Sequence, residues 1–173
     1  MSFIMMDIET DGPIPHDYSM ICFGAVVVAP GLEKQFYGRL QPISEKWIPE
    51  ALAISGFTRA QTLSFPDPKQ TMEQFSNWIT ENSNGRPFFI ADNNGFDWQF
   101  INWYFHHFLG KNPFGYSSYN LGSLYKGMVK DCFQNFKHLR KTPHTHHPLE
   151  DAIGNAEALL HMKKEMGLNI SLR

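Results

Sequence analysis

Two carboxylates near the start of the chain are spaced for shared chemistry. Asp7 and Glu9 lie in an apolar run, residues 3–9, that is typical of a β-strand. Side chains two positions apart leave the same face of a strand, so both carboxylates are expected to lie together at its carboxyl end. Close carboxylates repel unless a cation lies between them, and hard divalent ions prefer oxygen ligands. The alternative is a strand that simply continues into a polar loop.

Two further acids lie at predicted helix starts. Asp97 follows a short apolar run, residues 88–91, and a polar loop, whereas Asp92 lies nearer the strand and could only cap that loop. The alternative interpretation is structural: Asp97 is simply an acidic residue at a helix N-terminus, where the helix dipole favours a negative charge. Asp151 lies in the first turn of a helix that begins at Pro148, and helical periodicity places it off the charged face. An acid that points away from the solvated face of a helix needs an explanation.

Histidines gather just before that last helix. His146 precedes Pro148, which brings its imidazole and the Asp151 carboxylate to the same helix end. His144, His146 and His147 could instead form a zinc cluster, because imidazoles suit zinc, although there is no nearby cysteine and no HExxH pattern. A solvated loop is the third interpretation.

The apolar periodicity predicts the elements that must position these residues. Strands first, a hairpin, and then strand–helix alternation predict an α/β three-layer domain with a central mixed sheet flanked by helices. The predicted strands are 3–9, 20–29, 34–40 and 88–91, and the predicted helices are 51–54, 71–80, 97–109, 121–136 in pieces, and one from Pro148 onward.

Length and composition define the broad class. The chain has 173 residues, 42% hydrophobic and 18% charged, which predicts one folded domain over 1–173 with no appended domain. We expect no membrane span, because no apolar stretch is long enough, and no signal peptide, because the N-terminus lacks a basic region. Two cysteines without CxxC spacing favour a reducing, cytoplasmic location.

Together the motifs resemble those of the DEDDh superfamily of 3′-to-5′ exonucleases, which have a ribonuclease H-like fold. The histidine subclass fits, because His146 is five residues before the last acid, whereas a sister group has Tyr at the position of His147. The matching segments are Asp-Ile-Glu-Thr-Asp-Gly at 7–12, Asn-Asn-Gly-Phe-Asp at 93–97 and His-His-Pro-Leu-Glu-Asp-Ala at 146–152.

The resemblance implies a reaction and a role in it for each of the candidate residues. Asp7, Glu9, Asp97 and Asp151 are expected to hold two Mg²⁺ or Mn²⁺ ions, and His146 is expected to act as the general base. Water activated by a metal and the histidine is expected to attack the terminal phosphodiester of a single-stranded nucleic acid. The product is a nucleoside 5′-monophosphate.

The resemblance also indicates candidate substrate contacts next to the acids. Thr10 and Gly12 belong to the first motif. Residues 49–58 resemble the helix and turn that line the terminal nucleotide in this superfamily, but Ser55 stands where the family often has His. Phe57 could stack on a base there, or it could be a core residue.

A basic segment precedes the last motif. Residues 126–147 have a net charge of +4 in a chain whose net charge is −2, which predicts contacts to a nucleic-acid backbone. The expected contacts are Lys137, Arg140 and Lys141, with Phe133 and Phe136 interleaved. A solvated helix and loop is the alternative.

Three questions about partners and reaction stay open at this point. We expect a member of the ribonuclease T-like branch, which favours RNA over DNA and allows a homodimer. A ribonuclease H-type endonuclease and a non-catalytic nucleic-acid or metal-binding module are the alternatives. Mononucleotide products distinguish the exonuclease from both.

Overall fold

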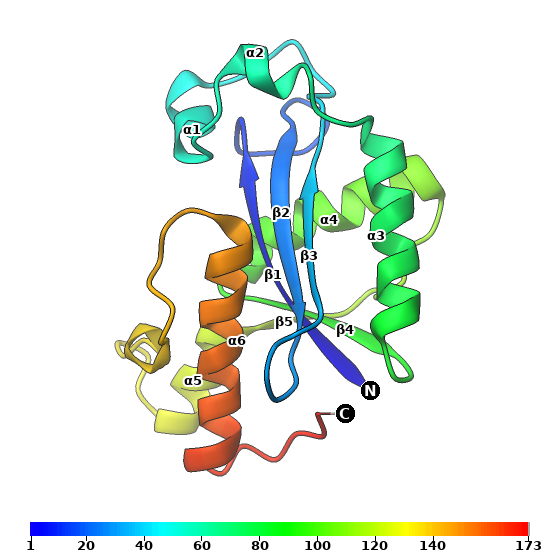
Figure 1. Ribbon diagram of the computed structural model, residues 1–173. Helices are drawn as coiled ribbons and strands as arrows, with labels where there is room; N and C mark the ends of the chain where they lie inside the picture. The colour runs from blue at the N-terminus through cyan, green and yellow to red at the C-terminus, as the bar shows by residue number, and fades with distance from the viewer. Residues whose placement is uncertain (173) are drawn as a thin grey trace.

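A five-stranded mixed sheet forms the middle layer of the protein in a computed structural model that describes residues 1–172 (Figure 1). The strand order is β3-β2-β1-β4-β5, with β1 in the centre. β1 pairs antiparallel with β2 and parallel with β4, as the prediction of a mixed sheet requires. The strands are β1 Ser2–Thr10, β2 Met20–Val27, β3 Gln35–Arg39, β4 Pro87–Ala91 and β5 Ser118–Asn120.

Helices cover both faces of this sheet. α3 and α4 pack on one face, and α5 and α6 on the other (Figure 1). The predicted helical stretch 121–136 ends early, at Val129, where Lys130 has a φ of +57°. The helices are α1 Pro49–Ile54, α2 Arg59–Thr62, α3 Pro68–Asn82, α4 Asn94–Leu109, α5 Leu121–Val129, the 3₁₀ helix η1 Lys137–Leu139 and α6 Pro148–Glu165. Among the described residues, no helix is both long and apolar enough to cross a membrane.

The alternation of side chains along β1 divides the core into two parts. Ile4, Met6 and Ile8 contribute to the core under α3 and α4, whereas Phe3 and Met5 contribute to the core under α5 and α6. Asp7 and Glu9 are the next odd-numbered residues, so they continue the second face. The two acids therefore lie on the side of the sheet that α6 covers.

One glycine lets α6 approach the sheet beside these acids. Gly24 of β2 pairs with Asp7 of β1. A Cβ atom on Gly24 would lie 2.3 Å from the Cα of Leu149, in the first turn of α6. Only a residue without a side chain allows this approach, which brings Asp151 to the sheet. No pattern in the sequence indicates this role of Gly24.

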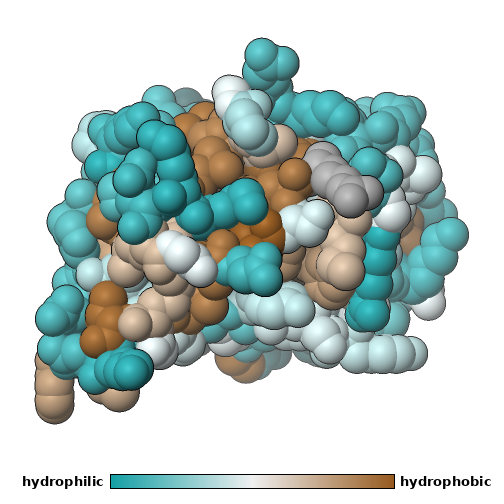
Figure 2. Space-filling model, turned by 90° about the horizontal axis from the view of Figure 1, so that it is seen from below, coloured by the Kyte–Doolittle hydropathy of each residue, from teal (hydrophilic) through white to brown (hydrophobic). Residues whose placement is uncertain are grey.

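The two ends of the molecule differ in character. α1 and α2 lie beyond the carboxyl end of β1 (Figure 1). The opposite end, seen from below in Figure 2, shows apolar side chains at the surface. Leu168, Ile170 and Leu172 of the C-terminal segment are partly buried against the core under α6.

Candidate active site

The four predicted acids converge from three elements. Asp7 and Glu9 come from β1, Asp97 from the first turn of α4, and Asp151 from the first turn of α6. Carboxylate oxygens of Asp7, Glu9 and Asp151 lie within 4.8 Å of one another. Asp97 is buried, and its carboxylate accepts a hydrogen bond from the Ile8 amide. Because Ile8 belongs to β1, Asp97 lies beside that strand. Strand periodicity for Asp7 and Glu9 and helical periodicity for Asp151 thus indicated residues that the tertiary structure brings together.

Burial and mutual repulsion perturb these carboxyl groups. Desolvation, followed by the charges of Asp97, Asp151 and Glu9, raises the pKa of Asp7 well above its usual value. Desolvation and then the Asp151 charge raise the pKa of Glu9 to about 7. Desolvation raises the pKa of Asp97 to about 8, although hydrogen bonds from the backbone amides of Asp97 and Ile8 oppose the shift. The cluster is therefore poorly neutralised by the protein itself.

This donor set fits hard divalent cations. Four carboxylates supply only oxygen ligands, which Mg²⁺ and Mn²⁺ prefer. A cation among them would offset the repulsion that raises the pKa values. Asp92, whose charge also raises the pKa of Asp97, is itself paired with the Arg140 guanidinium at 3.3 Å.

Asp151 also organises the loop that carries the histidine. Its Oδ1 accepts a hydrogen bond from the Thr145 amide at 3.0 Å, and its Oδ2 accepts one from the His146 amide at 2.9 Å. The Nδ1 atom of His144 lies 2.9 Å from the same Oδ2. These contacts stabilise His146 in a left-handed conformation with a φ of +61°. The loop is therefore held in shape by contacts within the protein itself.

The His146 imidazole faces the acids from the solvent side. Its Nδ1 atom lies 3.8 Å from Glu9 Oε1, and its side chain is 55% exposed. His147 lies elsewhere, because its ring stacks on Tyr37 with the centroids 4.8 Å apart. The structure therefore does not build the three-histidine cluster considered above. His144 and His146 instead share the Asp151 carboxylate, and their donor atoms lie within 4.8 Å of it.

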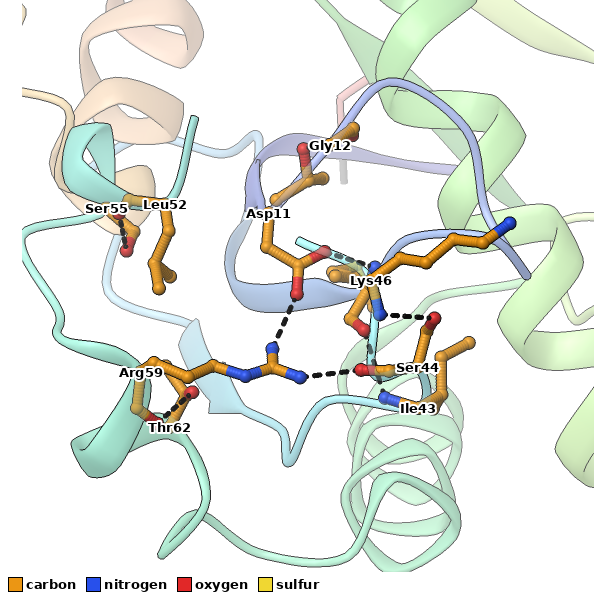
Figure 3. Close-up of polar contacts among 12 residues, drawn as sticks. Asp11, Gly12, Ile43, Ser44, Lys46, Leu52, Ser55, Arg59 and Thr62 are labelled. Carbon is orange, nitrogen blue, oxygen red and sulfur yellow. Dashed lines mark hydrogen bonds and ion pairs between the residues drawn. The ribbon is translucent and has the colours of Figure 1, made fainter. Parts of the chain in front are cut away.

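The Thr10–Gly12 turn begins at the last residue of β1 and includes Asp11 and Gly12, which are labelled in Figure 3. The Thr10 hydroxyl donates to the Gly12 carbonyl at 2.8 Å. Asp11, which the sequence analysis did not single out, is fully buried and forms an ion pair with Arg59 of α2 at 2.9 Å. Arg59 also donates to the Ser44 carbonyl at 2.6 Å. This bond network ties the segment that contains α1 and α2 to the end of the strand that carries Glu9.

Phe57 lies between α1 and α2 and is partly buried. Its ring packs edge-on against Phe65, with the centroids 4.8 Å apart. It borders a small apolar cluster formed by Ile21, Leu52 and Phe65. One part of the ring thus contributes to packing, and the remainder is available at the surface.

The basic segment is only partly at the surface. Lys137 and Lys141 are exposed. The Arg140 side chain is only 7% exposed, and it contacts Asp92 and Asn155 while lying over the Phe136 ring. We therefore correct the expectation for Arg140, because a guanidinium engaged inside the protein is not a surface contact for phosphate.

Comparison with known proteins identifies the family. The family model for exonucleases of the RNase_T type matches residues 4–159. The chain belongs to this exonuclease family. A relative, the 3′-5′ DNA exonuclease Cap18 of Escherichia coli, is 41% identical over 129 residues, which cover 73% of this chain and 68% of the relative.

Two solved structures share the fold of this exonuclease. The nuclease domain of 3′hExo, a DEDDh family member bound to rAMP, has a TM-score of 0.78 at 18% identity, covering 98% of this chain and 96% of that one. A zinc-bound E. coli ExoI–ssDNA complex has a TM-score of 0.71 at 16% identity, covering 96% of this chain but 42% of that one. The ribonuclease H-like α/β fold is confirmed by these structures, and the family and the relative show that the protein is a hydrolytic 3′-to-5′ exonuclease.

Proposed function

We propose that this exonuclease removes nucleotides from the 3′ end of single-stranded DNA. The observation that carries the proposal is the convergence of two buried carboxylates, Asp97 and Asp151, with the partly buried Asp7 and Glu9 at the carboxyl end of β1, where the accessible His146 imidazole faces Glu9. We assign Asp7, Glu9, Asp97 and Asp151 as ligands of Mg²⁺ or Mn²⁺, and His146 as the general base. When bound, the cations would neutralise the carboxylates and stabilise the charge that develops on the phosphate.

The histidine has the position and exposure for proton transfer. His146 can take a proton from the water whose oxygen attacks the terminal phosphorus. The bond from that phosphorus to the 3′ oxygen of the preceding nucleotide then breaks, and the leaving oxygen takes up a proton from a second water molecule. This releases a nucleoside 5′-monophosphate and leaves a 3′ hydroxyl. Asp151 supports this step, because its hydrogen bonds to the 145–146 backbone hold the loop that presents the imidazole.

The proposed substrate path runs over the end of β1. The Thr10–Gly12 turn and the available part of Phe57 are proposed to receive the terminal nucleotide, whereas Lys137 and Lys141 are proposed to contact phosphates further along the strand. The Thr10 hydroxyl is engaged with the Gly12 carbonyl, so we assign the substrate contact to the backbone of this turn.

DNA rather than RNA is the proposed substrate because of the curated relative. That protein, at 41% identity, is named a DNA exonuclease, whereas the expectation of RNA rested on the ribonuclease T-like branch alone. Contacts to the 2′-hydroxyl decide between the two nucleic acids, and no sequence motif reports them.

The test uses 5′-labelled single-stranded DNA and RNA of identical sequence, with Mg²⁺, with Mn²⁺ and with EDTA. We expect a ladder that shortens by single nucleotides from the 3′ end, faster on DNA and abolished by EDTA. His146→Ala should lose the ladder, whereas Glu45→Gln, at an exposed loop position, should retain it. Faster degradation of RNA would overturn the choice of DNA, and cleavage of a circular single strand would indicate an endonuclease.

A further inference from the structure

An aromatic side chain is held in solvent by the turn between α5 and η1. In the described part of the chain, Phe133 is the most exposed large apolar side chain, with 99% of its surface accessible. The other phenylalanine of the basic segment, Phe136, is buried in the core under α5 and α6. An aromatic ring that contributes nothing to the core is available for a partner.

The turn that presents Phe133 is preformed. The Asp131 carboxylate accepts hydrogen bonds from the Phe133 amide at 2.9 Å and from Gln134 Nε2 at 3.1 Å. The Asn135 side chain accepts another from the Lys137 amide at 3.0 Å. Because these bonds order the backbone in advance, a ligand that contacts the ring does not have to order the turn.

The turn is also anchored toward the active site. After Phe136, the Arg140 side chain contacts Asp92, which directly follows β4, the strand parallel to β1. The amides of Lys141 and Thr142 donate to Glu157 of α6 at 2.8 and 2.7 Å. Phe133 is seven positions before Arg140, so the Cα atoms of the two residues lie at most about 25 Å apart.

Charge around the ring favours a polyanion. Asp131 is the only acid in 126–147, and the turn itself uses its carboxylate. Lys130 and Lys137 flank Phe133 in the sequence and are exposed, and Lys141 follows them at the surface. Cations around an exposed ring are the combination that binds single-stranded nucleic acid through both phosphates and bases.

We propose that Phe133 stacks on a base of the single-stranded substrate, upstream of the 3′ nucleotide that is being cleaved, while the neighbouring lysines contact its phosphates. This inference rests on the proposed action on single-stranded DNA. It predicts that the enzyme binds a long strand more tightly than a dinucleotide, because only the long strand reaches the ring. Loss of one stacked base is expected to weaken binding by about 5- to 150-fold.

The experiment compares wild type with Phe133→Ala on a long single-stranded oligonucleotide and on a dinucleotide. We expect a KM for the long strand that is higher by about 5- to 150-fold, an unchanged kcat, and unchanged kinetics on the dinucleotide. Phe133→Tyr should restore the KM, whereas Phe133→Leu should not, because it keeps an apolar side chain without a ring. Tyr116→Ala removes another highly exposed aromatic, outside the basic segment, and should have no effect.

Binding in the absence of cleavage separates this inference from the proposed function. Fluorescence anisotropy with labelled DNA and a chelator measures Kd on an intact strand. An equal Kd for wild type and Phe133→Ala would overturn the inference even if the enzyme is active. A higher Kd for the variant than for wild type would support the stacking role of Phe133. If the same protein degraded no DNA, only the proposed exonuclease function on DNA would fail. A dimer in solution that Phe133→Ala dissociates, with no change in KM, would identify a second copy of the chain as the partner.

Discussion

Replacing Glu9 by Gln is expected to stabilise the metal-free protein at alkaline pH while abolishing its activity. Burial and the Asp151 charge raise the pKa of Glu9 from 4.5 to about 7 in the folded protein. Between these two values the folded state retains a proton that the unfolded state has released. The free energy of unfolding therefore falls as the pH rises from about 4.5 to about 7. Gln carries no charge at any pH, so the free energy of unfolding of the variant does not fall for this reason.

The size of the effect follows from the two pKa values of Glu9. Each pH unit between them corresponds to about 1.4 kcal/mol, so ionised Glu9 destabilises the folded state by about 3 kcal/mol at about pH 9. In a protein of this length that corresponds to a Tm higher by about 6–12 °C for the variant. Near pH 4 both states are protonated, and the two proteins should melt together.

The assay is thermal unfolding followed by circular dichroism in EDTA, from about pH 4 to about pH 9. Glu45→Gln removes an exposed carboxylate and should match wild type throughout. Mg²⁺ added in excess over EDTA should narrow the difference in Tm between the variant and wild type. Binding of the cation stabilises the wild type, whereas the variant has lost one of the ligands. A Glu9→Gln variant that is no more stable than wild type at alkaline pH would refute the repulsion argument. A difference already present near pH 4 would assign the effect to packing instead.

The remaining predictions concern the histidines, the helix contact and the ion pair. His146→Ala should lower kcat by about 10²- to 10⁴-fold, whereas His147→Ala should leave kcat unchanged; equal losses in steady-state assays would contradict the assignment of the base. Gly24→Ala should lower stability by about 1–3 kcal/mol in urea unfolding and reduce activity, because its Cβ meets Leu149 in the turn before Asp151; a fully active, equally stable variant would contradict this. Arg59→Met should destabilise the protein by about 3–5 kcal/mol, with partial recovery in Arg59→Lys, and an unchanged urea midpoint would show that the pair is dispensable.

Local periodicity indicated three of the four acids of the candidate site, whereas Asp97 was indicated by its place between a polar loop and a helix and by the family resemblance. A strand has a period of two, so the apolar residues before Asp7 and Glu9 predicted that both carboxylates leave one face. The helical period placed Asp151 off the solvated face of α6, and it is buried. The start of α4 was predicted three residues late, because the polar loop before Asp97 obscures the Asn94 start.

Charge counting was less informative than periodicity. The basic segment gave Arg140 the same expected role as Lys137, but the fold buries the Arg140 guanidinium against Asp92. The two phenylalanines of the segment also differ in burial, since Phe136 is buried and Phe133 is exposed. Composition does not distinguish these pairs, because burial depends on which elements pack over each position.

The amino-acid sequence alone indicated the chemistry that we propose: the acids, the histidine and their order along the chain, together with the faces that Asp7, Glu9 and Asp151 occupy. These properties depend on residue type and on local repeats of two or 3.6 residues, which a sequence displays directly. Only the tertiary structure decided the contacts between distant segments, such as Gly24 with Leu149 and Asp11 with Arg59. Those contacts set the position of α6 and of the segment beyond β1, because close packing leaves no local signal at either partner.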